Sequence, residues 1–196
     1  MRVQVTFELG EADDKLEIPW ESHDGAIRYF DLREQPRALE QIEEARRHLP
    51  LRSFLAAVNS TDSVFATAKC DTWLKQDEPG SPEAEGGPYE FASYVDLVFA
   101  LEDFNFERGH YEGLTKRLEE LMTRGAAADT LRAELCVRHC HFRNVAGWGF
   151  YLTIFLCARG STPEQAELRW GLGLARLQQA LLFISRVIRH QLPQRS

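Results

Sequence analysis

The chain has 196 residues, of which 44% are hydrophobic and 27% charged, the composition of an ordinary globular protein that buries a core without disulfides. Its net charge is −7 and no element carries a cluster of Lys and Arg, which argues against a nucleic-acid partner because phosphate contacts supply most of that affinity. No basic leader with an apolar run, and no apolar run long enough to cross a bilayer, is visible. We therefore expect a cytoplasmic protein with reduced cysteines and no membrane contact.

The charge is unevenly distributed along the chain. Residues 126–196 hold nine Arg and four acidic residues, a net charge of +5, whereas residues 1–125 carry a net charge of −12. Such a split is typical of differently solvated faces, and it would also favour contact between the two halves or head-to-tail pairing between copies.

The first part of the chain predicts a strand followed by two helices. Residues 2–9 (RVQVTFEL) alternate in polarity, the period of a half-buried strand. GEADD follows as a turn, and we expect KLEIPW to extend the pairing until Pro19 stops it. Residues 36–48 predict a helix that Pro50 interrupts, and LRSFLAAV predicts a second short helix ending near Asn59.

Two strands and a helix are predicted next. The strands cover residues 64–73 and 89–101. Residues 74–88 join them as an acidic loop rich in Pro and Gly, which we expect to be mobile. An amphipathic helix follows over residues 106–124.

A second strand pair and a long helix complete the chain. The strands are predicted over residues 131–143 and 147–159. The final helix begins at STPEQ, where Ser161 or Thr162 caps it, and runs to about His190.

This order predicts an α+β fold in a single domain over residues 1–196. An N-terminal strand and two helices precede two ββα units, and we expect one twisted antiparallel sheet with helices on one face and the long C-terminal helix packed on it. The alternative is two small sheets meeting around that helix. Its second half, LQQALLFISRVI, is apolar on more than one side, which predicts either a central place in the core or an interface with another subunit.

The stretch CVRHCHFR, residues 136–143, concentrates two cysteines and two histidines. On a strand, Cys136 and Cys140 share one face at about 13 Å, too far apart for one metal ion or a disulfide. His139 and His141 share the other face at about 7 Å between backbones, which imidazoles can close onto one divalent transition-metal ion.

A third ligand for the two histidines would have to come from another element. In the register that the turn NVAG favours, this end of the hairpin is apolar, with His139 opposite Leu152, His141 opposite Phe150 and Arg143 opposite Trp148. Packing without any cofactor is therefore the favoured interpretation of the pair. By residue type, the candidates for a third ligand are Asp71, Asp96 and Glu107.

Two further clusters have simpler interpretations than catalysis. In KCDTW, Cys70 points away from Lys69, which favours a buried hydrophobe over a reactive thiol. Lys69 and Asp71 share a face and predict an ion pair. Glu107 and His110 are three residues apart, and a helix start explains this acidic junction better than a metal site does.

A mixed set of polar and aromatic residues is expected on the sheet face opposite the helices. Arginine suits recognition of carboxylates, so this face is a candidate for a small anionic ligand or a peptide. A solvated face of cross-strand pairs is the favoured alternative. The ligand-binding candidates are Arg138, Arg159, Tyr94 and Tyr151.

No P-loop, dinucleotide fingerprint, nucleophile elbow or HExxH motif occurs. We therefore expect a non-catalytic binding or adaptor domain, homodimeric through the C-terminal helix or a sheet edge, with a protein or peptide partner. The order helix, strand pair, helix, strand pair, long helix resembles small dimeric secretion-chaperone-like domains, which bind partner polypeptides and commonly have an extra strand before the middle helix. The alternatives are a metal-dependent enzyme using His139 and His141, and a small-ligand regulatory domain using the arginine-bearing face.

Overall fold

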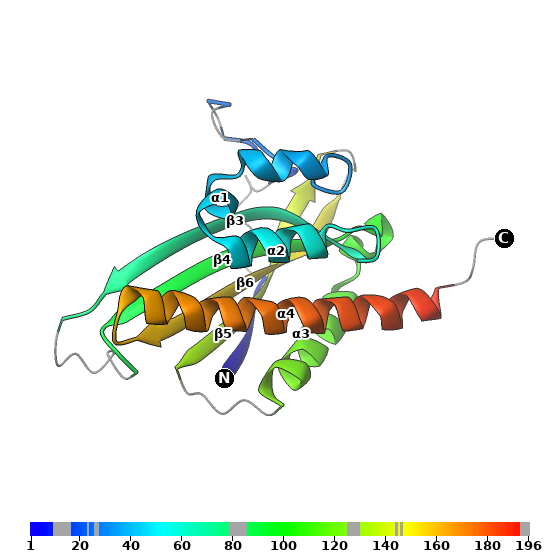
Figure 1. Ribbon diagram of the computed structural model, residues 1–196. Coiled ribbons are helices and arrows are strands. Elements are labelled where there is room, and N and C mark those ends of the chain that lie inside the picture. Colours follow the sequence, from blue (N-terminus) through cyan, green and yellow to red (C-terminus); the bar gives the residue numbers. More distant parts are fainter. Residues whose placement is uncertain are drawn as a thin grey trace.

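The computed structural model describes residues 1–9, 17–22, 24–25, 28–78, 86–124, 130–143, 145 and 147–192 (Figure 1). A mixed α+β fold is present in these residues, as the order of predicted elements indicates. Six strands form one sheet, so the alternative of two small sheets is wrong. The strands are β1 (Arg2–Glu8), β2 (Glu17–Ile18), β3 (Phe65–Gln76), β4 (Tyr89–Phe99), β5 (Leu131–Phe142) and β6 (Trp148–Gly160).

The strand order is β1-β5-β6-β4-β3, and β2 pairs with the far end of β5. The hairpins β3–β4 and β5–β6 are antiparallel, and β4 also pairs antiparallel with β6. In contrast, β1 and β2 both run parallel to β5, so the sheet is mostly antiparallel with a parallel edge. The expected pairing of KLEIPW with the first strand is also wrong, because Glu17 and Ile18 extend the same edge by pairing with His141 and Phe142.

The helical segments lie close to their predicted positions. The segment predicted as one helix over residues 36–48 is divided, because Ile42 is extended (φ −82°, ψ 113°). A 3-10 turn also precedes α3. The segments are η1 (Pro36–Gln41), α1 (Glu43–Arg47), α2 (Leu49–Val58), η3 (Glu102–Phe106), α3 (Arg108–Thr123) and α4 (Pro163–Gln191).

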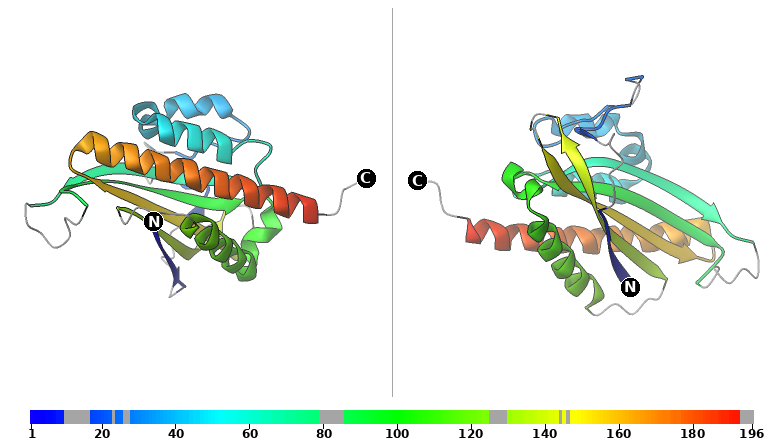
Figure 2. Two further views of the ribbon diagram at one scale, coloured as in Figure 1. Left: turned by 60° about the horizontal axis from the view of Figure 1, so that its bottom comes forward. Right: turned by 180° about the vertical axis from the view of Figure 1, so that it is seen from behind.

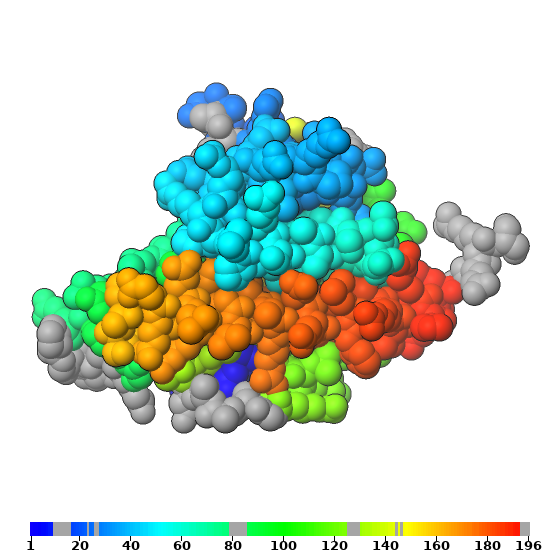
Figure 3. Space-filling model, viewed as in Figure 1, coloured from blue at the N-terminus to red at the C-terminus, as the bar shows by residue number. Residues whose placement is uncertain are grey.

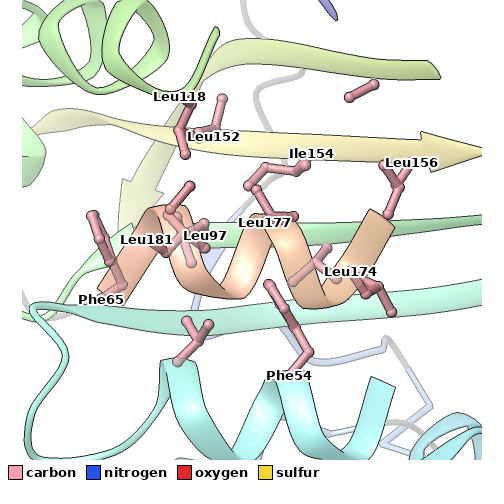
Figure 4. Close-up of a cluster of buried hydrophobic side chains, with 14 of the residues drawn as sticks. Phe54, Phe65, Leu97, Leu118, Leu152, Ile154, Leu156, Leu174, Leu177 and Leu181 are labelled. Carbon is pink, nitrogen blue, oxygen red and sulfur yellow. The ribbon is translucent and has the colours of Figure 1, made fainter. Parts of the chain in front are cut away.

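The helices cover one face of the sheet, with α4 across its middle, α2 beside it and α3 near β1 (Figures 1 and 2). Thr162 caps α4 by accepting a hydrogen bond from the Gln165 amide at 3.2 Å. Side chains of α4 then point into the sheet between α2 and the strands (Figure 4). The centre of this core consists of Leu174, Leu177 and Leu181 from α4, Leu152, Ile154 and Leu156 from β6, and Phe54 from α2.

The opposite face of the sheet, called the open face below, carries a second and smaller apolar cluster. Ile18 lies over one end of this face, in one cluster with Cys140 of β5, Tyr151 of β6, Ala66 of β3 and Val98 of β4. Arg143 holds Ile18 in place, because the Arg143 amide donates to the Ile18 carbonyl at 2.9 Å.

The two hairpins correct two expectations of register and length. His139 pairs with Phe150 and His141 with Trp148, a shift of two residues from the predicted register. A shift of two leaves every side chain on its predicted face, since the strand period is two. In the other hairpin, β3 continues to Gln76, so residues 74–76 belong to the strand and not to the predicted loop over 74–88. Residues 79–85 of that loop lie outside the described residues.

We predict that Leu177→Ala lowers the free energy of unfolding by about 2 to 5 kcal/mol, because this fully buried side chain meets the sheet and its removal leaves a cavity. Leu172→Ala is the matched control on the same helix. Leu172 is 65% exposed, so we expect a change within about 0.5 kcal/mol. Urea denaturation followed by circular dichroism measures both, and equal effects would contradict the one-sided burial of α4.

Candidate functional site

A row of polar side chains crosses the open face. The right-hand view of Figure 2 shows the molecule from behind, with the strands of this face toward the viewer. Arg138 Nε donates to Glu8 Oε2 at 2.8 Å, and Arg138 Nη1 lies 3.5 Å from Thr153 Oγ1. Thr153 Oγ1 in turn donates to Asp96 Oδ1 at 2.6 Å. Asp96 lies opposite Lys69 in the register of β4 with the edge strand β3. The row therefore runs through all five main strands of the sheet.

Asp96 is the buried acid of this row, with a relative exposure of 8%. Burial raises the pKa of its carboxyl to about 6, against the opposing effects of the Thr153 hydrogen bond and the charges of Lys69 and Arg138. Such a pKa is suited to proton exchange near neutral pH.

The two arginines proposed as ligand-binding residues already have partners within the protein. The hydrogen bond from Arg138 holds the pKa of Glu8 below its ordinary value. Arg159 is buried, with Nη1 2.6 Å from Asp77 Oδ2 and Nη2 3.0 Å from Glu90 Oε2. Since Asp77 follows the end of β3 and Glu90 lies near the start of β4, Arg159 joins β6 to the loop end of this hairpin.

The two tyrosines proposed with these arginines lie in different surroundings. Tyr151 is buried in the small apolar cluster of the open face, and burial raises the pKa of its phenol to about 12. Tyr94 lies between Trp73 and Phe155, at ring-centroid distances of 6.4 and 6.0 Å, and also lines a cavity at the edge of the sheet. The open face thus brings Tyr94 and Arg138 onto one surface but does not gather the four candidates at one point.

His139 and His141 share a face of β5, as predicted, and lie among aromatic rings. The His139 ring is 4.8 Å from that of Phe150, and the His141 ring is 3.6 Å from that of Trp148, between centroids. His139 Nδ1 is buried and has no hydrogen-bond partner among the residues that the structure describes. The pair therefore has the contacts of packing residues, with one unsatisfied nitrogen.

The predicted third ligands do not join the two histidines. Asp71 and Asp96 face the open side of the sheet, whereas His139 and His141 lie on the helix side with Val137. Glu107 instead lies 3.3 Å from His110, in the predicted i, i+3 pair. Within the part of the chain that the structure describes, no group of three or more His, Cys, Asp or Glu side chains is arranged to hold a metal ion. A metal at His139 and His141 stays a prediction.

The four cysteines are free thiols. Burial raises the pKa of the Cys70 and Cys140 thiols to about 12 and that of Cys157 to about 11. These three thiols are therefore protonated at neutral pH, which makes them poor nucleophiles.

A cavity of about 550 Å³ lies at the outer edge of β3. Its floor is formed by Lys69, Cys70 and Asp71, and residues 41–44 form one wall. Its other wall comes from Trp20 and from residues within 28–32, which contact the open face at Trp20 and reach the main core at Leu32. Its volume is in the range of small-ligand sites.

The side of the cavity is fixed by hydrogen bonds from one arginine. Arg33 Nη1 donates to the carbonyls of Ser60, Ser63 and Phe65 at 2.9 to 3.1 Å. Asp31 Oδ1 accepts from the Arg33 amide at 2.9 Å. These bonds hold the backbone around Arg33 against the start of β3. The wall of the cavity that precedes Arg33 in the sequence is therefore fixed to the sheet.

A second candidate surface is the outer side of α4. Five exposed residues lie on this side at helical spacing, and we call them the outward stripe: Leu168, Leu172, Ala175, Gln179 and Phe183. Leu168, Leu172 and Phe183 are 66%, 65% and 54% exposed. Large apolar side chains repeated along one helix face are typical of a protein interface.

The sequence indicated these two surfaces unequally. The apolar surplus of the C-terminal helix was visible as a pattern, and the outward stripe is part of it. The cavity was missed, because Trp20, Tyr29 and Phe30 lie outside any periodic element. The density of aromatic residues in this short segment was the only signal available.

Comparison with known proteins gives no relative. No protein-family model, no curated protein and no solved structure matches the chain. Among the helices of the described residues, none has the length and apolar character needed to cross a membrane.

We predict that Asp96→Asn raises the free energy of unfolding at about pH 8 by about 2 to 3 kcal/mol and changes it little near pH 4. Because the folded-state pKa is raised to about 6 from 3.8, the folded state binds the proton more tightly than the unfolded state. The contribution of Asp96 to stability is thus greatest below pH 3.8 and is lost as pH rises through 6. Urea denaturation across this range measures it. Asp71→Asn, at an exposed carboxylate, is the control.

We predict that His139→Phe raises the free energy of unfolding by about 1 kcal/mol, because it removes a buried nitrogen without a hydrogen-bond partner and keeps the ring contacts. Thermal unfolding of this variant and of the parent measures the change in stability. Elemental analysis of the parent protein measures any bound metal. Near-stoichiometric metal in the parent, lost in His139→Phe, would contradict the packing role and make the histidines ligands.

Proposed function

We propose that the protein is a non-catalytic binding domain that acts as a homodimer, with the α4 helices of two copies packed antiparallel along the outward stripe. The observation that carries the proposal is the exposure of Leu168, Leu172 and Phe183 on one side of α4. The other side of the same helix is buried in the core. Figure 3 views the molecule from the exposed side of α4, with α4 across the front surface and α2 above it. A helix that is apolar on both sides is typical of subunit interfaces.

The outward stripe is nearly symmetric about its middle residue, Ala175. If a two-fold axis passes through Ala175, Leu168 of one copy faces Phe183 of the other, and Leu172 faces Gln179. An isologous interface requires this self-complementarity, because the same surface is used twice. The small side chain of Ala175 at the axis would allow the helices to approach to about 8 to 10 Å.

Charged residues at the ends of the stripe also favour an antiparallel pair. Glu164 and Arg186 are exposed and lie at equal sequence distances from Ala175, about three helical turns away on each side. The antiparallel arrangement therefore brings Glu164 of one copy opposite Arg186 of the other at both ends. A parallel arrangement would place like charges together.

A neighbouring apolar residue extends this surface. Leu49, the first residue of α2, is 70% exposed. The next residue, Pro50, approaches α4 so closely that a Cβ at Gly171 would lie 3.0 Å from its Cγ. His48 Nδ1 lies 2.7 Å from Glu167 Oε1 on the same side of α4. Leu49 is thus held beside the half of α4 that carries Leu168 and Leu172.

The state of the reactive groups supports a non-catalytic role. The raised pKa values of Cys70, Cys140 and Cys157 keep these thiols protonated. The guanidinium groups of Arg138 and Arg159 are paired with carboxylates of the same chain. A chaperone-like or adaptor role, in which a dimer presents two binding surfaces to a partner polypeptide, agrees with these features.

We predict that the double variant Leu168→Glu, Leu172→Glu is a folded monomer, whereas the parent protein is a dimer. In the antiparallel pair the introduced carboxylates would be buried against Phe183 and Gln179 of the other copy at a large desolvation cost, while exposed positions of a monomer tolerate them. Light scattering after size-exclusion chromatography measures the mass, and circular dichroism checks the fold. Leu74→Glu, at a residue 49% exposed on the edge strand β3, is the matched control. A parent that is monomeric at high concentration, or a dimer lost only in Leu74→Glu, would overturn the α4 interface.

Disulfide trapping tests the direction of the helices. In the antiparallel pair, Cys introduced as Ala175→Cys lies at the axis, within the separation of about 4.4 to 6.8 Å between Cα atoms that a disulfide requires. Cys introduced as Gln179→Cys is displaced from its copy by about 12 Å along the helices and should not crosslink. Crosslinking of both variants would instead indicate a parallel pair.

A further inference from the structure

We propose that the cavity at the edge of β3 binds an organic cation, an alkylammonium or guanidinium group, between the ring of Trp20 and the carboxylates of Glu44 and Asp71. The site shares no lining residue with α4, so this proposal is independent of the homodimer. It rests on three features of the cavity, which are its aromatic walls, the cations already placed on those walls and its unpaired carboxylates.

Four aromatic rings line the cavity, and their faces already receive cations of the protein. Lys69 Nζ lies 4.3 Å from the centroid of the Trp20 ring and 5.6 Å from that of Tyr94. Arg28 Cζ lies 5.6 Å from the centroid of the Phe30 ring. The fourth ring, Tyr29, is also partly buried. Aromatic faces arranged in this way are the chemistry that recognises ammonium and guanidinium groups.

The carboxylates of the cavity are not neutralised by these cations. Glu43 is paired with Arg47, but Glu44 and Asp71 form no ion pair within the described part of the chain, and neither does Lys69. Negative charge also acts on the residues that line the cavity. Next to burial, the charges of Glu44, Asp71 and Asp96 are what raises the pKa of the Cys70 thiol. The pKa of the Tyr94 phenol is raised by the same three carboxylates in addition to burial.

An anionic ligand fits this cavity poorly. It would meet Lys69 and Arg28, but both already lie over aromatic rings, and three lining carboxylates would repel it. A cationic ligand is instead attracted by the carboxylates of Glu44 and Asp71. It competes with the Lys69 ammonium group for the face of the Trp20 ring. Lys69 therefore acts as an internal competitor, and its removal should strengthen binding of a cation and weaken binding of an anion.

The cation has two sources, a free small molecule or the Arg or Lys side chain of a polypeptide. Two matched probe pairs distinguish them. The first pair is n-butylguanidine and its neutral isostere n-butylurea. The second is the acetylated and amidated tripeptide Gly-Arg-Gly and the same tripeptide with citrulline in place of Arg. Binding is followed by the indole N–H signals of ¹⁵N-labelled protein, with Trp20→Phe used to assign the Trp20 signal.

We expect saturable shifts of the Trp20 signal with n-butylguanidine and not with n-butylurea. Trp20→Ala and Glu44→Gln should each weaken binding by about tenfold, the effect of one cation–π or charge contact. Lys69→Gln should strengthen it by a similar factor. Glu40→Gln, at an exposed acid of η1 outside the cavity lining, is the control and should have no effect.

Tighter binding of the Arg tripeptide than of n-butylguanidine would indicate a polypeptide ligand, and the reverse a free small molecule. The proposal is overturned if neither cation gives a saturable shift, if the neutral isosteres bind equally well, or if Lys69→Gln weakens binding. The variant Leu168→Glu, Leu172→Glu should bind the probes as the parent does. Loss of the dimer and loss of the cation site are therefore observed separately.

Discussion

The structure depends on the contact between α4 and the middle of the sheet. Leu174, Leu177 and Leu181 are buried against the strands, so α4 occupies the centre of the helix side and leaves only its flanks to α2 and α3 (Figure 4). Because all three helices share one face, the open face of the sheet has to be covered by other means. Ile18 covers one end, and the polar row and the aromatic side chains around Tyr94 lie beyond it.

The polar row of the open face links the two ends of the sheet. It begins at the ion pair of Glu8 with Arg138 on β1 and β5 and ends at Lys69, which forms part of the cavity floor on β3. A buried carboxylate costs free energy unless it is paired, and Asp96 accepts a hydrogen bond from Thr153 but forms no ion pair among the described residues. The raised pKa of Asp96 is the direct consequence. The charge on Asp96 therefore adds to the negative field at the cavity when it is ionised.

Local patterns in the sequence were sufficient for the elements but not for their distant pairings. Period-two alternation located each long strand to within a few residues, and the cap at Thr162 located the start of α4. The parallel pairing of β1 with β5 could not be predicted, since it joins residues about 130 positions apart and no local pattern encodes such a partner. The two-residue shift at His139 has a different cause. Between the paired residues His141 and Trp148, the chain has two residues more than the NVAG motif alone, Phe142 and Arg143, and both lie on the β5 side, so this longer turn shifts the register by two. The cavity combines segments that lie far apart in the sequence, and among its lining residues only Lys69, Cys70, Asp71 and Tyr94 had been singled out, without any sign that they share a cavity.

The outward stripe and the cavity lie on different elements, and this separation has a consequence for binding. A dimer formed through α4 would leave both cavities open, because no lining residue of the cavity belongs to α4. Two cation sites related by a two-fold axis would engage two basic side chains of one polypeptide, and the second contact would then be intramolecular. Weak single contacts of the cation–π type would add to a useful affinity only in this way. Self-association through one side of α4 would thus turn a weak site at the sheet edge into an effective binding surface.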